Sequence, residues 1–243
     1  MKRGWSLLVC CLVLTSAIAG AQGRRSLGKP GNSIGKRILA VGDSITQGAG
    51  YTGGYRGILE AKIRGLGYSF EFLGGRTDNS NGMISKNHEG HGGWNTTELL
   101  NGRASDPSSG KLGDWLKAYR PDVVLLMAGT NDNPWVSQQE WTLRYLKLLD
   151  TIWKYNPDTR VVLASIPKSY TPKTGKQIAE ANCFSIVKSI VAAKRAKYFP
   201  IAFADTYTNF NIFTDLYDQY HPNKSGYTKI ADAFLKALTT GFR

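Results

Sequence analysis

Four polar side chains at widely separated points of this chain have the types needed to attack and cleave an acyl bond. Ser44 lies in GDSIT, Asn131 lies in GTND, and Asp218 stands three residues before His221 in DQYH. A histidine can take the proton of a serine hydroxyl that attacks a carbonyl, and a carboxylate on the imidazole Nδ1–H supports the charge that forms on the ring. An amide can donate to the oxyanion. These residues can act as one site only if the fold brings them together.

A second serine competes with Ser44 for the role of nucleophile. Ser33 lies in GNSIG, which matches the G-x-S-x-G pattern of many serine hydrolases. That pattern works by placing the serine on a tight turn from a strand to a helix. The residues directly before Ser33, GRRSLGKPGN, contain no apolar run, whereas Ser44 is separated by one residue from the end of the run KRILAVG. The position therefore favours Ser44, for which the alternative role is a helix N-cap or turn residue.

Short apolar runs alternate with helical patterns through the rest of the chain. The runs are KRILAVG, YSFEFLG, DVVLLMAG, RVVLASI and YFPIAFA, and helical spacing covers 54–66, parts of 96–119, 137–155, 175–196 and 223–240. Strands that are apolar on both faces and alternate with helices predict an α/β fold, a three-layer α/β/α sandwich around a five-stranded parallel sheet. Ligands bind such sheets at the carboxyl ends of the strands. Ser44, Asn131 and the Asp218–His221 pair each follow a different strand.

A glycine-rich loop, NHEGHGGWNT, follows the second predicted strand. Its glycines, among them Gly93, let a backbone N–H approach a ligand without a Cβ in the way. His88, Glu89 and His91 do not have the i, i+4 spacing of a helical zinc motif. We therefore expect them to hydrogen-bond the loop, with no metal and no cofactor.

The blocks GDSIT, GHGGW, GTND and DQYH resemble, in order, the four signature blocks of the SGNH (GDSL-type) hydrolases. NHEGHGGW, preceded by GGYRGILEAKI and FEFLGGRTD, resembles the acetyl xylan esterases of carbohydrate esterase family three. The resemblance implies a flavodoxin-like SGNH hydrolase fold with Ser44 as nucleophile, His221 as base and Asp218 as its orienter. It also implies an oxyanion hole made of the backbone N–H groups of Ser44 and Gly93 and the side chain of Asn131.

Bulky side chains are expected at the rim of this site. Gln219 and Tyr220 stand between Asp and His, where related esterases often carry small or apolar residues. Trp94, beside the loop glycine, and Trp135, after NDNP on a strand-end loop, are candidates for stacking on a sugar ring. Arg56 in GGYRG is expected to be a salt-bridging helix-start residue. The other tryptophans beyond residue 36 lie in helical patterns and are expected in the core: Trp115, Trp141 and Trp153.

The amino-terminal residues have the pattern of a secretory leader. Lys2 and Arg3 form a positive segment, an apolar stretch follows, and small residues provide a cleavage site. A membrane anchor would need about 20 apolar residues, so we expect a secreted, extracellular protein without a membrane span after cleavage. The predicted parts are a signal peptide over 1–21, a flexible arm over 22–36 and a hydrolase domain over 37–243.

Charge and cysteine content limit the partners and the means of stabilisation. The chain carries 31 basic and 18 acidic residues, a formal charge of +13. A positive field attracts acidic partners, and uronic-acid-bearing cell-wall polymers are one hypothesis. Nucleic acid is the least natural partner of an exported protein. The basic residues are spread along the chain, which favours a generally basic surface over a specific acidic partner. Cys183 alone remains after the leader and lies in a helical pattern, so we expect it to pack in the core.

The sequence therefore predicts a secreted, monomeric serine esterase that removes acetyl groups from a plant cell-wall polysaccharide or a small ester. A lipase-like or lysophospholipid esterase is one alternative, but it would need an apolar groove or lid that the polar loop 75–93 does not offer. A non-catalytic polysaccharide-binding protein on the same scaffold is the other, and loss of a catalytic residue would favour it.

Overall fold

The structure is a computed structural model that describes residues 36–170 and 174–242. The predicted signal peptide, nearly all of the predicted arm and Ser33 lie outside the described residues. The first strand begins at Lys36, one residue before the predicted start of the hydrolase domain.

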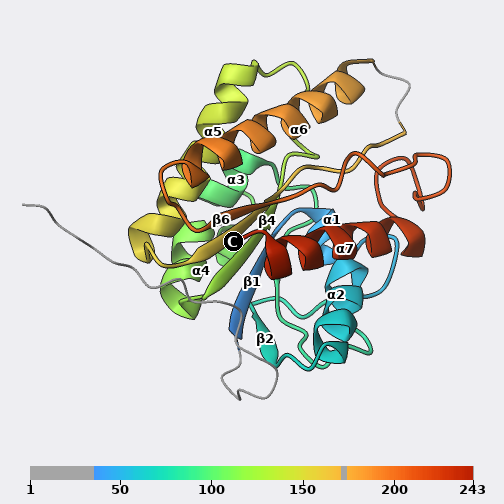
Figure 1. The fold of residues 1–243 in the computed structure, drawn as a ribbon. Helices are drawn as coiled ribbons and strands as arrows, with labels where there is room; N and C mark the ends of the chain where they lie inside the picture. Colours follow the sequence, from blue (N-terminus) through green and yellow to red (C-terminus); the bar gives the residue numbers. More distant parts are fainter. Residues whose placement is uncertain (1–35, 171–173, 243) are drawn as a thin grey trace, which may run out of the picture.

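Five parallel strands form the central sheet in the order β2-β1-β4-β5-β6 (Figure 1). Their bounds are β1 (Lys36–Gly42), β2 (Phe70–Leu73), β4 (Val123–Met127), β5 (Arg160–Ala164) and β6 (Ile201–Ala204). A two-residue strand, β3 (Glu89–Gly90), pairs with the carboxyl end of β1, beyond the segment that pairs with β2. The predicted five-stranded sheet is confirmed, and β3 is too short to give a hydrophobic pattern in the sequence.

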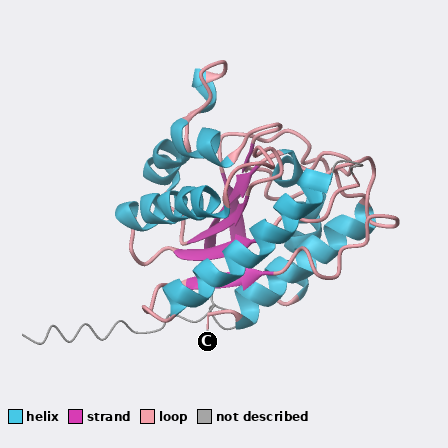
Figure 2. Cartoon of the chain, turned by 90° about the horizontal axis from the view of Figure 1, so that it is seen from above, coloured by secondary structure: helices cyan, strands magenta, loops and turns pink. Residues whose placement is uncertain are grey.

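Helices cover both faces of the sheet, as Figures 1 and 2 show. The helices are α1 (Ser44–Gln47), α2 (Gly54–Gly65), α3 (Thr96–Asn101), α4 (Leu112–Tyr119), α5 (Gln138–Tyr155), α6 (Thr174–Arg195) and α7 (Lys224–Thr240), with a 3₁₀ turn at Pro107–Ser109. Leu39 and Val41 of β1 join the core formed with α3 to α6, whereas Ile38 and Ala40 join the core formed with α2 and α7. The alternation arises because successive side chains of a strand point to opposite faces. The predicted three-layer architecture is confirmed.

Side-chain caps set the starts of several helices. Asn95 accepts from the backbone N–H groups of Thr97 and Glu98, and Glu98 returns the bond to the Asn95 N–H, which makes a capping box at the start of α3. Asn223 caps α7 through its side-chain oxygen alone, which accepts from the backbone N–H groups of Ser225 and Gly226. Both asparagines belong to N-x-S/T sequons.

The remaining core predictions are also confirmed. Three tryptophans predicted to pack are buried, namely Trp115, Trp141 and Trp153. Cys183 is fully buried, and burial raises the pKa of its thiol to about 12, so it is a packing residue without thiolate character at neutral pH. Among the helices of residues 36–170 and 174–242, none has the length and apolar character that crossing a bilayer requires.

Candidate active site

Ser44, His221 and Asp218 form a continuous hydrogen-bonded line at the carboxyl end of the sheet. His221 Nε2 lies 2.9 Å from Ser44 Oγ, and His221 Nδ1 lies 2.8 Å from Asp218 Oδ2. Because a carboxylate can only accept, Nδ1 carries the hydrogen and Nε2 presents its lone pair to the serine hydroxyl. This is the tautomer that a general base for Ser44 requires.

The Asp218 carboxylate is oriented by its own turn. Its second oxygen, Oδ1, accepts from the backbone N–H groups of Tyr220, at 2.8 Å, and His221, at 2.7 Å. Partial burial raises the pKa of Asp218, but the hydrogen bonds from the imidazole and from these two N–H groups outweigh it, so the pKa lies below its ordinary value. The carboxylate is therefore ionised at neutral pH, as a partner of an imidazolium must be.

Ser44 is the first residue of α1, where β1 turns directly into a helix. The N-cap is Asp43, whose Oδ1 accepts from the Ile45 N–H at 2.9 Å, so the N-cap role weighed for Ser44 belongs to its neighbour. The turn needs glycine at position 42, because a Cβ there would lie 2.2 Å from the carbonyl oxygen of Met127 in β4. The first N–H groups of a helix lack intrahelical partners, so the Ser44 N–H can donate to a bound ligand.

The glycine-rich loop packs directly on α1. A Cβ at Gly90 would lie 2.3 Å from the backbone nitrogen of Gln47, and the His91 N–H donates to the Gly42 carbonyl at 2.9 Å. Gly93 has a φ of +75°, a backbone conformation that favours glycine. The loop therefore reaches the predicted nucleophile only because its backbone carries no side chains at the points of contact.

Asn131 joins this loop from the β4–α5 connection. Its Nδ2 donates to the carbonyl oxygen of Trp94 at 3.0 Å. The four blocks that carry Ser44, Gly93, Asn131 and His221 thus converge at one edge of the sheet. Their roles in an oxyanion hole and a catalytic triad stay predictions, and the placement is the one that those roles require.

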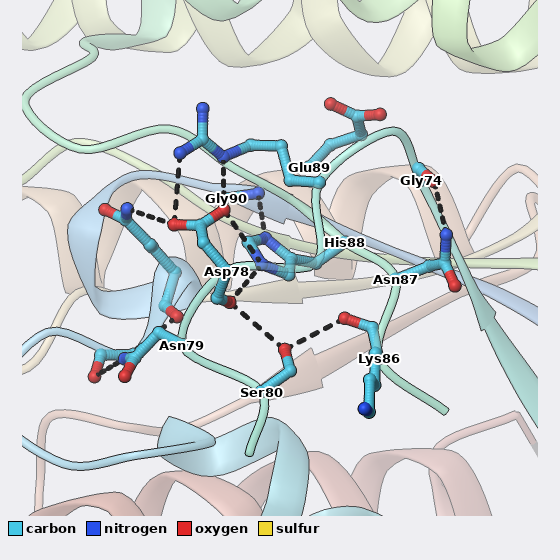
Figure 3. A network of polar contacts seen from close by, with 12 residues as sticks. Gly74, Asp78, Asn79, Ser80, Lys86, Asn87, His88, Glu89 and Gly90 are labelled. Carbon is cyan, nitrogen blue, oxygen red and sulfur yellow. Dashed lines mark hydrogen bonds and ion pairs between the residues drawn. The ribbon is translucent and has the colours of Figure 1, made fainter. Parts of the chain in front are cut away.

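His88 supports the glycine loop from behind (Figure 3). The Gly90 N–H donates to His88 Nδ1 at 3.0 Å, so the ring hydrogen is on Nε2, which donates to the Asp78 carbonyl at 2.9 Å. Burial, together with the nearby Arg56 cation, lowers the pKa of His88 to about 4. A neutral imidazole in one tautomer therefore connects the Asp78 turn to the backbone of the loop, in agreement with the hydrogen-bonding role predicted for His88.

Arg56 is completely buried against α1, the short helix that begins with Ser44. Its Nε donates to the Thr46 carbonyl at 2.8 Å, and Nη2 donates to the Gln47 carbonyl at 3.0 Å. Its Nη1 donates to Ser80 Oγ at 3.1 Å. Burial lowers the pKa of Arg56 to about 10, so it stays a cation at neutral pH. The predicted salt bridge is wrong among the described residues: the guanidinium satisfies the carbonyls at the end of α1, where the helix dipole favours a positive charge.

Trp94 is 2% exposed, and the prediction that it stacks on a sugar is wrong. Its indole stacks on His91 at 4.3 Å between ring centroids, and His91 stacks in turn on Trp115 at 4.8 Å. His91 Nε2 lies 2.8 Å from Glu89 Oε2. Trp135, by contrast, is 77% exposed and remains a candidate substrate contact. The sequence places both tryptophans beside the site. Whether each ring is buried or exposed depends on the side chains that pack behind its loop.

Arg103 is a site residue that sequence reasoning missed. Its Nη2 donates to the Gly93 carbonyl at 2.5 Å, while Nε contacts Glu98 Oε1 at 2.8 Å. The guanidinium lies over the Trp94 ring, 5.5 Å from the centroid. The contact forms because the loop after α3 folds back on the glycine loop, and no motif in the sequence signals it.

Comparison with known proteins agrees with this geometry. Residues 40–229 match the GDSL-like Lipase/Acylhydrolase family. A multidomain esterase from Ruminococcus flavefaciens is 31% identical over 225 residues, and the match covers 83% of this chain but only 28% of that longer protein.

Solved structures of carbohydrate esterases have the same fold. A family 3 carbohydrate esterase from Clostridium thermocellum is 28% identical, with a TM-score of 0.67 over 83% of this chain and 94% of that one. A family 3 carbohydrate esterase from Talaromyces cellulolyticus is 22% identical, with a TM-score of 0.65 over 82% of this chain and 94% of that one.

Proposed function

Since the chain belongs to the GDSL-like lipase/acylhydrolase family, carboxylic ester hydrolases of the SGNH type, we propose that it removes acetyl groups from a plant cell-wall polysaccharide such as xylan. The observation that carries the proposal of ester hydrolysis is the line from Asp218 through His221 to Ser44, with contacts of 2.8 and 2.9 Å. A carbohydrate ester is proposed as the substrate from the similarity to the Clostridium thermocellum family 3 carbohydrate esterase. The acetyl group and the xylan are proposed from the resemblance of NHEGHGGW to the acetyl xylan esterases of that family.

The proposed reaction has two halves that use the same groups. Ser44 Oγ attacks the ester carbonyl while His221 Nε2 takes the hydroxyl proton, and the oxyanion accepts from the N–H groups of Ser44 and Gly93 and from Asn131. The tetrahedral intermediate collapses, the sugar oxygen leaves with the proton from His221, and an acetyl-serine remains. Water then loses a proton to His221 and attacks the acetyl group, which releases acetate and restores Ser44.

The direct test is acetate release from acetylated xylan, together with turnover of p-nitrophenyl esters of increasing acyl length. We expect acetate release from the polymer and the highest kcat/KM on the acetyl ester. Ser44→Ala is the control, and activity that persists in this variant contradicts the mechanism. Higher kcat/KM on octanoyl or longer esters than on the acetyl ester contradicts the acetyl specificity and favours the lipase-like alternative. An inactive wild-type chain that still binds xylan favours the non-catalytic alternative.

We also propose that the protein is exported and acts as a monomer. The leader pattern, with Lys2 and Arg3 before an apolar stretch, supports export. Amino-terminal sequencing of protein recovered from the medium should give a first residue near 22, and retention inside the cell contradicts the proposal. Light scattering after gel filtration measures the oligomeric state, and a dimer mass contradicts the monomer.

A further inference from the structure

Four exposed aromatic residues lie on the loop that carries Asp218 and His221 or on the neighbouring connection. They are 40 to 81% exposed and form what we call the aromatic rim: Tyr170, Phe213, Tyr217 and Tyr220. Three of them lie on the β6–α7 connection, which forms the loops at the right of Figure 1, and Tyr170 lies on the β5–α6 connection. Single exposed aromatics are common on protein surfaces, whereas several of them close to one site are typical of an interaction surface.

The backbone of two rim residues is hydrogen-bonded to the loop that carries Asp218 and His221. The Tyr217 N–H donates to the His221 carbonyl at 2.8 Å, and the Tyr170 N–H donates to the Gln219 carbonyl at 2.8 Å. The rings of Tyr170 and Phe213 lie 6.3 Å apart between centroids. The backbone of Tyr217 is therefore bonded directly to His221, whose Nε2 lies 2.9 Å from Ser44 Oγ, and the backbone of Tyr170 is bonded two residues before His221.

The loop under the rim is held in one conformation by a buried carboxylate. Asp215 is fully buried and accepts from the Asn211 N–H at 2.7 Å, from Ser225 Oγ at 2.8 Å and from Lys229 Nζ at 2.6 Å. The Asn223 N–H donates to the Asp215 carbonyl at 2.9 Å. Because the loop is ordered before any ligand binds, little conformational entropy is lost when the rings make contact.

We propose that the aromatic rim is a binding subsite for sugar units of the polysaccharide, which is the alcohol part of the ester. These units are the neighbours of the sugar whose acetyl group is attacked by Ser44. Pyranose rings present apolar C–H faces bordered by hydroxyl groups. Tyrosine offers an apolar ring face and a hydroxyl that bonds such edges, and phenylalanine offers the face alone. The identity of the polymer rests on the proposed function. The subsite adds the place at which the alcohol part of the ester binds.

The test compares rim variants with a matched exposed aromatic outside the site. Tyr170→Ala and Phe213→Ala remove rim rings without touching the Tyr217–His221 contact. Tyr198→Ala is the control, because Tyr198 is 94% exposed but lies before β6, at the opposite edge of the sheet. The measured quantity is the ratio of kcat/KM on acetylated xylo-oligosaccharides to kcat/KM on p-nitrophenyl acetate. We expect each rim variant to lower this ratio roughly 2- to 10-fold through a higher KM on the oligosaccharide, and the control to leave it unchanged.

A binding measurement separates the rim from the chemistry. In the Ser44→Ala background, calorimetric titration with unacetylated xylo-oligosaccharides should show weaker binding after loss of Tyr170 or Phe213 and unaltered binding after loss of Tyr198. If every variant has the kcat/KM ratio and the oligosaccharide affinity of the wild-type rim, the proposed subsite is contradicted. A loss confined to long acyl esters also overturns it, because the rings would then contact the acyl chain. If the wild-type chain releases no acetate from xylan, the proposed function fails, while the binding titration still decides the rim.

Discussion

Asn131 donates one hydrogen of its side-chain amide to the carbonyl oxygen of Trp94, 3.0 Å away. A side-chain amide nitrogen has two hydrogens, so this bond holds the group in place and leaves the second N–H to be aimed at a ligand. The contact also connects the β4–α5 connection to the loop that carries Gly93. Two of the three predicted oxyanion donors are therefore positioned against each other before substrate binds.

Removal of this amide should lower turnover more than binding. Asn131→Ala deletes both the donor and the bond to Trp94, and we expect kcat on p-nitrophenyl acetate to fall about 10²-fold or more, with a much smaller change in KM. Steady-state kinetics measures this split, and circular dichroism checks that the variant folds. A kcat that stays within about threefold of the wild-type value contradicts the oxyanion role of Asn131.

Arg103 should affect catalysis through the Gly93 peptide. Arg103→Met removes the hydrogen bond to the Gly93 carbonyl, and we expect a loss of roughly 10-fold or more in kcat because the loop donor is displaced. Steady-state kinetics on p-nitrophenyl acetate measures the loss.

Arg64 is a matched control for Arg103. It lies over the Phe70 ring at 5.2 Å, contacts Glu60, and donates to the Phe70 carbonyl at 3.2 Å. The side-chain exposures of Arg103 and Arg64 are similar, 27% and 30%. Arg64, however, contacts the first residue of β2, at the amino end of the sheet, whereas Ser44 follows the carboxyl end of β1. Arg64→Met should lower the thermal midpoint without lowering kcat. Equal losses of kcat in both variants would mean that Arg103 acts through stability alone.

His88 should make the folded state weaker in acid. Its pKa is about 4 in the fold and 6.5 ordinarily, so below pH 6.5 the unfolded chain binds a proton that the folded chain does not. The contribution of His88 to the free energy of unfolding is fully present above pH 6.5 and is lost as the pH falls toward 4. The whole loss is on the order of 3 kcal/mol. Urea unfolding across this range measures the slope.

His88→Asn gives the control for that slope. Asparagine keeps an acceptor for the Gly90 N–H but does not titrate, so the variant should be less stable at neutral pH and should lose the His88 part of the pH dependence. An unchanged slope in the variant would assign the acid sensitivity to other groups.

Gly90 and Gly65 should respond oppositely to the same substitution. Gly90→Ala places a Cβ 2.3 Å from the backbone nitrogen of Gln47, so α1 and the loop must separate, and both stability and kcat should fall. Gly65→Ala, at the end of α2, meets nothing within 4 Å and should stabilise the protein by about 0.5 kcal/mol. Thermal unfolding and kcat of the two variants decide this, and a neutral Gly90→Ala would show that the contact with α1 is not required.

The sequence predicted the sheet and most of the helices because their patterns are local. β4, with five consecutive buried residues, and α5, with a regular apolar stripe, are each specified by their own residues. β3 has no such pattern, because its two residues form a strand only through their pairing with Val41 and Gly42 of β1, a distant segment. The salt bridge predicted for Arg56 is wrong for a related reason. Its partners are the carbonyls of Thr46 and Gln47, which Arg56 meets only because α1 ends against α2.

By itself, the sequence determined which residues could do chemistry and at which edge of the sheet they lie. Asp218 and His221 are three residues apart, so a single turn brings them into contact, and Ser44 and Asn131 follow strands of one parallel sheet. Only the tertiary structure decided how the neighbouring side chains are used. It buried Trp94 on His91, left Trp135 in solvent, and placed Arg103 on the Gly93 carbonyl. Those outcomes depend on contacts between segments far apart in the chain, and local residue patterns carry no information about which long-range partners meet.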